Sequence, residues 1–395
     1  MRTIRQVFAV TALNLRNLPQ RLASSAVAVV GVGAVVLVFA AVLSMAEGLQ
    51  RTMLSTGADD AAVVMRSGST SELNSTLLND QVLIIANAPG VLKDGDRPVM
   101  SAELYVVTDI RKRSNNTDAN VPFRGVQAGA FDVRDNVRIT EGRMFEPGKN
   151  EIVVGQAAQS EFVGLDIGQS IRFGQIEWAV VGTFEAGGSV SESELWTDVR
   201  VLQSAYRRGN SFQSVRVRLE SPESIETLRQ ALDEDPRIDP DVLTERDYYS
   251  SQSQGLVQFI KIVGYPLTIL MAIGAVFGAL NSMYSSVSVR GKEIATLRAL
   301  GFGPTAVLIS TIVESVLLAL VGGLLGGLLA YLVFNGFQAS TLNGVSFSQV
   351  VFNFAVTPEL LGQGLKAALA IGVAGGLFPA VRAARLPVAQ ALREL

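Results

Sequence analysis

Residues 288–302 read SVRGKEIATLRALGF and lie between two long apolar runs of the sequence. Ile294, Leu297 and Leu300 recur every three residues, so on a helix they form one stripe, and charged side chains cover the remaining surface. The pattern predicts a short amphipathic helix. Because a few polar residues would be enough to join two membrane helices, a patterned helix at this point indicates a surface that binds something.

The composition indicates a membrane protein without an active site of its own. The chain has 395 residues, 48% of them hydrophobic, and a mean hydropathy of +0.33. It contains no cysteine and no histidine, which excludes thiol nucleophiles, disulfides and the commonest general base and metal ligand. We therefore predict no catalytic residue and no metal site. The net charge of -3 gives no reason to expect a nucleic acid as a partner.

Four segments are long and apolar enough to cross a hydrocarbon core of about 30 Å. They cover residues 22–46, 256–287, 305–334 and 360–381. Residues 1–21 carry four arginines, no acid and apolar residues at helical spacing, which predicts an amphipathic helix on the membrane surface. The fold class is thus a membrane protein with four transmembrane helices.

Residues 47–255 form a polar, turn-rich segment between the first and second spans, and its pattern predicts a large α+β domain. Helices are predicted at 156–163 and 224–234, the second because it follows Ser221-Pro222 and has Glu in its first turn. Strands are predicted from short β-branched and aromatic runs at 61–65, 82–86, 104–107, 151–154, 170–173, 178–181 and 214–219.

The distribution of charge predicts the orientation in the membrane. The N-terminus, the 288–304 segment and the 382–395 tail hold ten Lys and Arg residues against two acids, whereas the 335–358 stretch holds no charged residue. By the positive-inside rule, both termini and residues 288–304 lie in the cytoplasm, while the 47–255 domain and the 335–359 loop lie outside. G-x-x-x-G pairs at 274/278, 322/326, 323/327 and 372/376 predict close contacts between the spans.

Glu314 is the one acid well inside a predicted span. A carboxylate at mid-helix costs about 2.5–3.5 kcal/mol on insertion scales, so it should face protein rather than lipid. Three roles are open: a structural partner for a neighbouring helix or for the 288–302 segment, a part in conformational coupling, or a proton relay. The relay has the least support, since the spans contain no second acid or histidine to pass a proton on.

Three stretches resemble one known family. The run R-G-K-E-I-A-T-L-R-A-L-G-F at 290–302 resembles the cytoplasmic coupling helix of MacB/FtsX-like permeases, the transmembrane subunits of type VII ABC transporters. Residues 141–185 resemble the family's extracytoplasmic domain, with G-R-x-F, N-E-I-V-V-G and V-V-G-T-F signatures. The tail F-P-A-V-R-A-A-R-L-P-V-A-Q-A-L-R at 378–393 resembles the usual ending of these permeases.

The resemblance implies a permease subunit rather than an enzyme. ATP hydrolysis on a separate ATPase chain would move the periplasmic domains and drive export or extrusion, as in an efflux pump or a lipoprotein-releasing complex. The expected contacts with the ATPase are Arg290, Lys292, Glu293, Ile294, Leu297 and Arg298. Of these, Ile294 and Leu297 would anchor in a groove of the ATPase, and Glu293 and Arg298 would fix the register.

No G-x-x-x-x-G-K-[ST] phosphate loop occurs in the sequence, so the chain is expected to bind no cofactor, with ATP and Mg held by the partner ATPase. Implied partners are an ATPase dimer, a second permease copy or a related permease, a periplasmic adaptor and an outer-membrane component. The implied location is the bacterial inner membrane. Two alternatives stay open: an FtsX-like regulator of periplasmic cell-wall hydrolases, and an ATPase-independent membrane receptor or scaffold.

Overall fold

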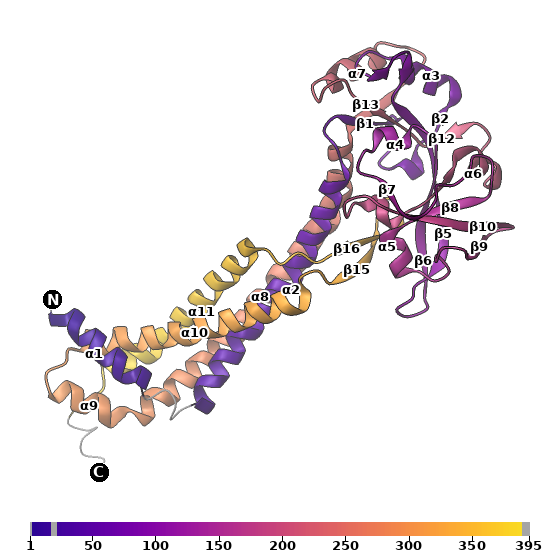
Figure 1. Ribbon diagram of the computed structural model, residues 1–395. Helices are drawn as coiled ribbons and strands as arrows, with labels where there is room; N and C mark the ends of the chain where they lie inside the picture. The colour runs from indigo at the N-terminus through magenta and orange to yellow at the C-terminus, as the bar shows by residue number, and fades with distance from the viewer. Residues whose placement is uncertain (1, 17–21, 389–395) are drawn as a thin grey trace. The chain divides into compact units, whose positions relative to one another are not determined.

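The computed structural model describes residues 2–16 and 22–388 (Figure 1). The remaining positions of the predicted N-terminal helix and tail, including Arg393, lie outside the described residues. The chain divides into two compact units. We call them the helical unit (Met1–Glu47, Phe259–Phe337 and Phe354–Leu395) and the sheet unit (Gly48–Gln258 and Gln338–Asn353).

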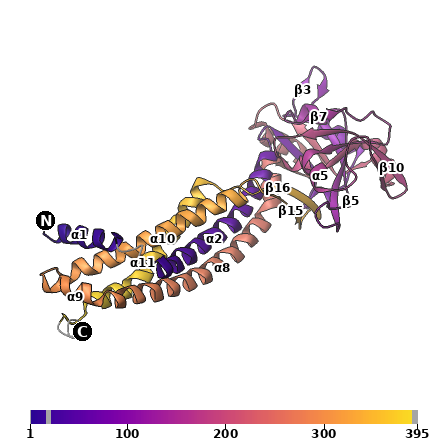
Figure 2. The same cartoon turned by 60° about the horizontal axis from the view of Figure 1, so that its bottom comes forward.

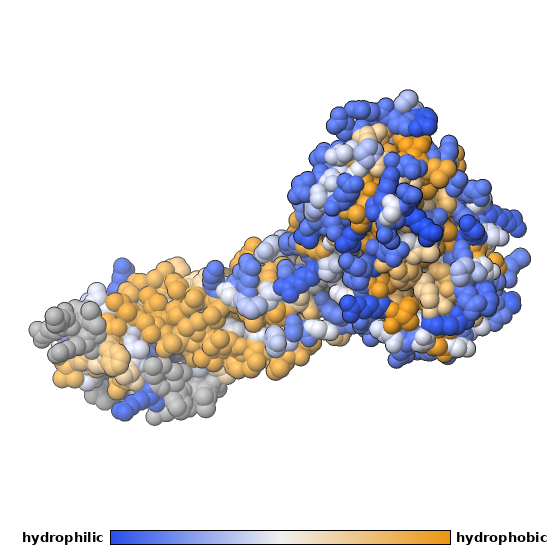
Figure 3. All heavy atoms as spheres, turned by 45° about the horizontal axis from the view of Figure 1, so that its top comes forward, coloured by the Kyte–Doolittle hydropathy of each residue, from blue (hydrophilic) through white to orange (hydrophobic). Residues whose placement is uncertain are grey.

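The helical unit contains the four predicted spans, and each is a helix long and apolar enough to cross a membrane. Their bounds are α2 (Leu22–Thr56), α8 (Glu245–Val289), α10 (Pro304–Phe334) and α11 (Pro358–Ala384). Figure 2 shows them alongside one another, and Figure 3 shows the apolar surface of this unit in orange. Two shorter helices, α1 (Arg2–Arg16) and α9 (Gly291–Ala299), match the predicted amphipathic segments. Since α2 and α8 extend past the predicted spans into the sheet unit, their apolar pattern marked only their membrane portion.

Small residues let the long helices approach closely. A Cβ atom on Gly326 would lie 2.2 Å from the carbonyl oxygen of Gly33, so α10 and α2 touch through their backbones. A Cβ atom on Gly372 would lie 2.7 Å from that of Ala319, which joins α11 to α10 in the same way. The predicted close contact is wrong for Gly274 and Gly278, because no other part of the described chain comes within 4 Å of a Cβ built there.

The described residues of the sheet unit form a ten-stranded mixed sheet in the order β14-β1-β13-β5-β6-β11-β8-β10-β7, with β9 paired to β10. The β6/β11 and β8/β10 pairs are parallel, and the other pairs are antiparallel. The strands are β1 (Ala61–Arg66), β5 (Met100–Arg111), β6 (Asp118–Val126), β7 (Arg138–Gly142), β8 (Glu151–Gly155), β9 (Ser170–Phe173), β10 (Ile176–Glu185), β11 (Leu195–Asp198), β13 (Ser214–Arg218) and β14 (Pro240–Thr244).

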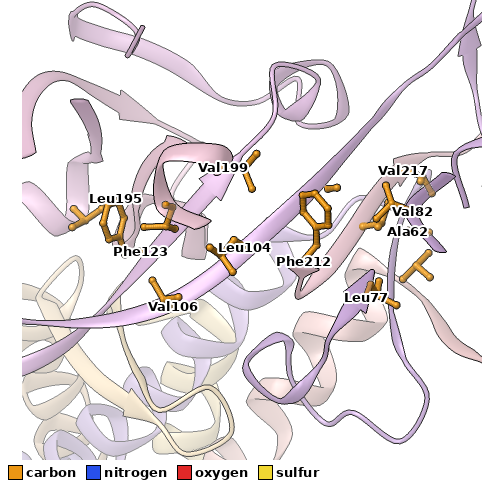
Figure 4. Close-up of a cluster of buried hydrophobic side chains, with 14 of the residues drawn as sticks. Ala62, Leu77, Val82, Leu104, Val106, Phe123, Leu195, Val199, Phe212 and Val217 are labelled. Atoms are coloured by element: carbon orange, nitrogen blue, oxygen red, sulfur yellow. The ribbon is translucent and has the colours of Figure 1, made fainter. Parts of the chain in front are cut away.

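The main core of this unit lies on one face of the sheet (Figure 4). Alternate residues of the central strands supply it, as the two-residue period of a strand requires, and helices α3 (Asn79–Asn87), α6 (Val199–Ala205) and α7 (Ser224–Asp233) contribute further side chains. The predicted strand at 82–86 is wrong: this run belongs to α3, where Val82, Ile85 and Ala86 form a buried face at helical spacing. The helices predicted at 156–163 and 224–234 are present as α5 (Gln156–Glu161) and α7.

The 335–359 stretch, predicted as a loop, contains a β-hairpin. Strands β15 (Gln338–Asn343) and β16 (Ser348–Asn353) pair antiparallel from Gln338 opposite Asn353 to Asn343 opposite Ser348. The hairpin is part of the sheet unit, although it joins two helices of the helical unit.

Candidate functional site

The α9 segment forms as the sequence predicts, and the residues after it explain where it ends. Gly301 has a φ of +93°, a conformation that glycine adopts without strain, and its N–H donates to the carbonyl of Arg298 at 3.1 Å. Pro304 then opens α10, where a missing N–H costs nothing. The chain turns sharply here, and α9 lies at the end of the helix bundle near α1 (Figure 1).

Arg290 and Glu314 form a buried ion pair in the helical unit. The Arg290 side chain is 6% exposed and that of Glu314 is 5% exposed, and Arg290 Nη1 donates to Glu314 Oε2 at 2.8 Å. Arg290 Nε also lies 3.4 Å from a carboxylate oxygen of Glu293. The structure thus confirms that Glu314 faces protein, and it supplies the partner in the 288–302 segment that the first of the three proposed roles required.

Ile294 is buried within its own chain. It packs with Val287 of α8, Val307 of α10, and Ala383 and Leu386 at the end of α11. A side chain that anchors in a groove of another protein has to be exposed before it binds. In the chain on its own Ile294 is therefore not available to a groove of an ATPase, and it packs α9 against three other helices. Its contact with an ATPase stays a prediction.

Arg298 also binds inside the chain. Its Nη1 donates to the carbonyl of Ala384 at 3.1 Å and to that of Leu386 at 2.7 Å. The last carbonyls of a helix have no partners within that helix, so Arg298 caps the C-terminal end of α11. Leu297 is half-buried beside it.

The exposed residues of α9 and its C-terminal cap are Lys292, Glu293, Thr296, Ala299 and Leu300. We call Lys292, Glu293, Thr296 and Leu300 the α9 outer face. Lys292, Thr296 and Leu300 lie four residues apart and share one side of the helix. Leu300 is 73% exposed, although the sequence pattern placed it on the stripe with Ile294. The outer face is held in place from a second side, because Gln6 of α1 donates to the carbonyl of Gly301 at 3.3 Å.

The sheet unit holds a second candidate site, a cluster of charged side chains on the face of the sheet opposite the main core. The strand register places its central members side by side, since Glu103 on β5 lies opposite Ser214 on β13, and Tyr105 on β5 lies opposite Arg124 on β6. All the charged members are at most 6% exposed. They are Glu72, Glu103, Arg124, Arg134, Glu194, Arg216 and Glu245, which we call the buried charged cluster.

Two arginines connect the cluster. Arg124 binds Glu72 at 2.7 Å, Glu103 at 2.9 Å and Glu194 at 2.7 Å. Arg216 binds Glu103 at 3.2 Å and Glu72 at 3.3 Å. Guanidinium groups suit this role because they stay charged and donate several hydrogen bonds in one plane.

The arginines keep the carboxyl groups of Glu72 and Glu103 ionised. Burial acts to raise the pKa of Glu72, but the positive charges of Arg124 and Arg216 outweigh it and hold that pKa well below its ordinary value. Burial likewise acts against ionisation of Glu103, yet Arg134 and Arg124 lower its pKa to about 2. Glu72 and Glu103 are therefore charged at neutral pH.

The cluster reaches the first turn of α8. Arg216 Nη1 binds Glu245, the first residue of α8, at 2.5 Å, and its Nη2 donates to the hydroxyl of Tyr249 at 3.0 Å. The hydroxyl of Tyr248 accepts from the Glu72 N–H at 3.3 Å. The last residue of α2, Thr56, is also bonded within the sheet unit: its Oγ1 accepts a hydrogen bond from the Val190 N–H at 2.8 Å.

The β15/β16 hairpin closes the cluster from another side. Tyr105, whose ring lies under Arg124 at 4.8 Å, shares a 2.8 Å hydrogen bond between its hydroxyl and that of Ser348. A cavity of ≈ 20 Å³ lies between the cluster, α2, α8 and the hairpin residues Asn343, Ser346, Ser348 and Val350.

Further hydrogen bonds hold β15 against the sheet. Lys112 Nζ donates to Ser340 Oγ at 2.7 Å, and Ser340 Oγ donates to a carboxylate oxygen of Glu161 at 2.6 Å. Because α10 leads into β15 and α11 follows β16, this hairpin links those two helices to the sheet unit through the chain.

The described residues contain no group of three acidic side chains placed to hold a metal ion. What the two sites share is attachment: the α9 segment contacts α8, α10 and α11, and the buried charged cluster holds the first turn of α8. The sequence carried one signal for the buried charged cluster, namely single charges inside otherwise apolar strands, as in S-A-E-L-Y-V-V and V-P-F-R-G-V.

Comparison with known proteins gives matches to two domain families. Residues 25–235 match the MacB-like periplasmic core domain, and residues 267–388 match the FtsX-like permease C-terminal domain.

Among relatives, the chain is 27% identical over 355 residues to the macrolide export ATP-binding/permease protein MacB 1/2 of Paracoccus denitrificans, covering 84% of this chain and 48% of that protein. It is 25% identical over 402 residues to the uncharacterized ABC transporter permease YvrN of Bacillus subtilis, covering 92% and 93%. The chain spans about half the length of the MacB relatives it matches. The crystal structure of the periplasmic region of MacB from Actinobacillus actinomycetemcomitans matches 51% of this chain and 95% of that one, at 11% identity and a TM-score of 0.37.

Proposed function

The chain belongs to the MacB/FtsX-like family of ABC transporter permeases, and from this premise we propose that it carries movement from an ATPase bound at the α9 outer face to the sheet unit. Both termini and α9 would lie in the cytoplasm, and the sheet unit would lie in the periplasm. ATP and Mg would be bound by the ATPase. The work done by the sheet unit would be export or extrusion of a substrate.

The observation that carries this proposal is the way α9 is attached. Arg290 binds Glu314 of α10, Ile294 packs on α8, α10 and α11, and Arg298 caps α11. A helix resting only on the lipid surface needs none of these contacts. Because packed interiors transmit displacement with little compression, a load on α9 would move three helices at once.

The helices that α9 contacts lead into attachments of the sheet unit. α8 begins at Glu245 in the buried charged cluster, and α10 and α11 flank the hairpin. These attachments support transmission by several routes rather than by one flexible linker.

The composition of the spans favours a mechanism in which the outer domain moves. It gives less support to a mechanism in which a substrate crosses a channel within one chain. The four long helices pack through glycine, alanine and valine, and the buried acid of α10, Glu314, is paired with Arg290. The match to a MacB-like core domain favours export over the regulation of cell-wall hydrolases. A second permease copy and a periplasmic adaptor are further proposed partners.

The experiment is to measure ATP hydrolysis stimulated by the permease, together with co-purification of the ATPase that binds the wild-type chain. Leu300→Ala removes the large exposed apolar side chain of the outer face and should weaken the assembly by about 1–2 kcal/mol. Glu293→Lys reverses a charge on the same face and should lower stimulation more than expression. Leu83→Ala, on an exposed leucine of α3 in the sheet unit, is the matched control.

If Leu300→Ala and Glu293→Lys both assemble and stimulate like wild type, the outer face is not the docking surface. Ile294→Ala separates docking from folding. It should lower the stability of the permease itself by about 2–5 kcal/mol, because it opens a cavity in the chain's own core.

A further inference from the structure

The helical unit has a groove at the C-terminal end of α11 that the proposed function does not use. Its volume is ≈ 670 Å³, within the range of about 300–1,000 Å³ that is usual for ligand pockets. It is lined by Leu377, Phe378, Val381, Arg382, Arg385, Leu386 and Pro387.

One part of the groove is an apolar wall within the predicted span. Phe378 is 63% exposed and Leu377 is 43% exposed. Phe378, Arg382 and Arg385 follow at spacings of four and three, so they lie on one side of α11. Along this side the surface changes from apolar to cationic as the helix reaches its end.

The other part of the groove is formed by two guanidinium groups. Arg382 is held over the ring of Tyr284 at 5.6 Å, which fixes the plane of its fork. Among the described residues, no carboxylate lies within ion-pair distance of Arg382 or Arg385. Two neighbouring guanidinium groups are suited to the oxygens of a phosphate, which they bind through paired N–H donors.

We propose that this groove binds an anionic phospholipid, with its headgroup phosphate on Arg382 and Arg385 and an acyl chain along Leu377 and Phe378. The occupant is a lipid rather than a soluble anion because the cationic part continues directly into an apolar wall at the end of a membrane span. Within the described residues these two arginines face no acid, and their charge matches the negative charge of such a headgroup.

The groove also adjoins the α9 segment. Its far wall includes Leu386, whose carbonyl accepts a 2.7 Å hydrogen bond from Arg298. A lipid in the groove would therefore rest against the same turn that Arg298 holds. The lipid site itself does not depend on the proposed function.

The test uses the full chain with Phe378→p-benzoylphenylalanine, a photo-reactive residue, in vesicles of equal parts phosphatidylglycerol and phosphatidylcholine. Cross-links should favour phosphatidylglycerol. Near a membrane surface each basic residue contributes about a fivefold preference for anionic lipid, so Arg382→Gln and Arg385→Gln should each lower the ratio about fivefold. Lys366→Gln, a cation elsewhere on α11, should leave the ratio unchanged.

Three results would overturn the proposal. The first is a ratio of phosphatidylglycerol to phosphatidylcholine cross-links that equals the ratio of the two lipids in the vesicles when Arg382 and Arg385 are both present. The second is a ratio that Arg382→Gln and Arg385→Gln do not change. The third is loss of the lipid cross-link when a competitor is added. Loss on adding inorganic phosphate would make a soluble anion the occupant, and loss on adding the ATPase would make a protein the occupant. Far-UV circular dichroism of each variant checks that a lower ratio of phosphatidylglycerol to phosphatidylcholine cross-links does not result from unfolding.

Discussion

Arg290 illustrates what a sequence pattern reveals and what it hides. The pattern places this residue among the charges on the surface of a predicted helix, but the structure buries it against Glu314. Amphipathic spacing distinguishes two sides of a helix; it does not say which charged side chain finds a partner in a neighbouring helix. The same pattern correctly leaves Lys292 and Glu293 exposed.

The Arg290–Glu314 pair predicts strong coupling between substitutions. Arg290→Met alone leaves a buried carboxylate without its partner and should lower stability by about 3–5 kcal/mol. Arg290→Met with Glu314→Leu replaces the pair by apolar groups and should recover most of that loss, while stimulation of the ATPase stays low because the ion pair that joins the start of α9 to α10 is gone. Thermal unfolding in detergent measures the first effect. Additive losses in the double variant would contradict the pairing.

The buried charged cluster predicts the response of the sheet unit to acid. The pKa of Glu103 is lowered to about 2, and that of Glu72 is lowered further, both from an ordinary value near 4.5. The stability that these carboxylates contribute is therefore present above pH 4.5 and is lost as the pH falls towards 2, by about 3 kcal/mol for Glu103.

Tryptophan fluorescence measures this response, because both tryptophans of the chain, Trp178 and Trp196, are fully buried in the sheet unit. Glu103→Gln should lower stability at pH 7 and weaken its dependence on pH between 4.5 and 2. Identical acid transitions in the variant and the wild type would show that Glu103 is not an ionised member of the cluster.

At the scale of elements, long and uniform patterns were predicted well and short ones were not. The four spans and α9 are confirmed because more than twenty apolar residues, or a periodic face, leave few alternatives. The strand predicted at residues 82–86 was wrong because a five-residue apolar run fits a strand and a buried helix equally. The hairpin was missed because residues 335–358 carry no charge, and their partners lie more than a hundred residues away in the sequence.

The hairpin predicts a measurable change in local protection. Lys112→Ala together with Ser348→Ala removes the hydrogen bonds to Ser340 and Tyr105, each worth about 0.5–1.5 kcal/mol. Hydrogen exchange in residues 338–353 should become faster while β1 stays protected, and stimulation of the ATPase should fall. Arg111→Ala, which breaks only an exposed ion pair with Asp118, is the control. Unchanged exchange in the hairpin would contradict its attachment through these residues.

At the scale of the whole molecule, α8, α10 and α11 take part in contacts of both units. In the helical unit α9 contacts α8, α10 and α11, and in the sheet unit the buried charged cluster and the hairpin hold the start of α8 and the connection between α10 and α11. This arrangement suits a permease that passes on movement.

The central claim is that an ATPase engages the α9 outer face, and cysteine footprinting tests it most directly. The chain has no cysteine, so Thr296→Cys creates a single site in the middle of that face. Its alkylation by a maleimide should be fast in the isolated permease and strongly slowed in the stoichiometric complex with the ATPase, whereas Ser114→Cys in the sheet unit should react at one rate in both. Equal alkylation rates of Thr296→Cys in the free and bound permease would contradict the account.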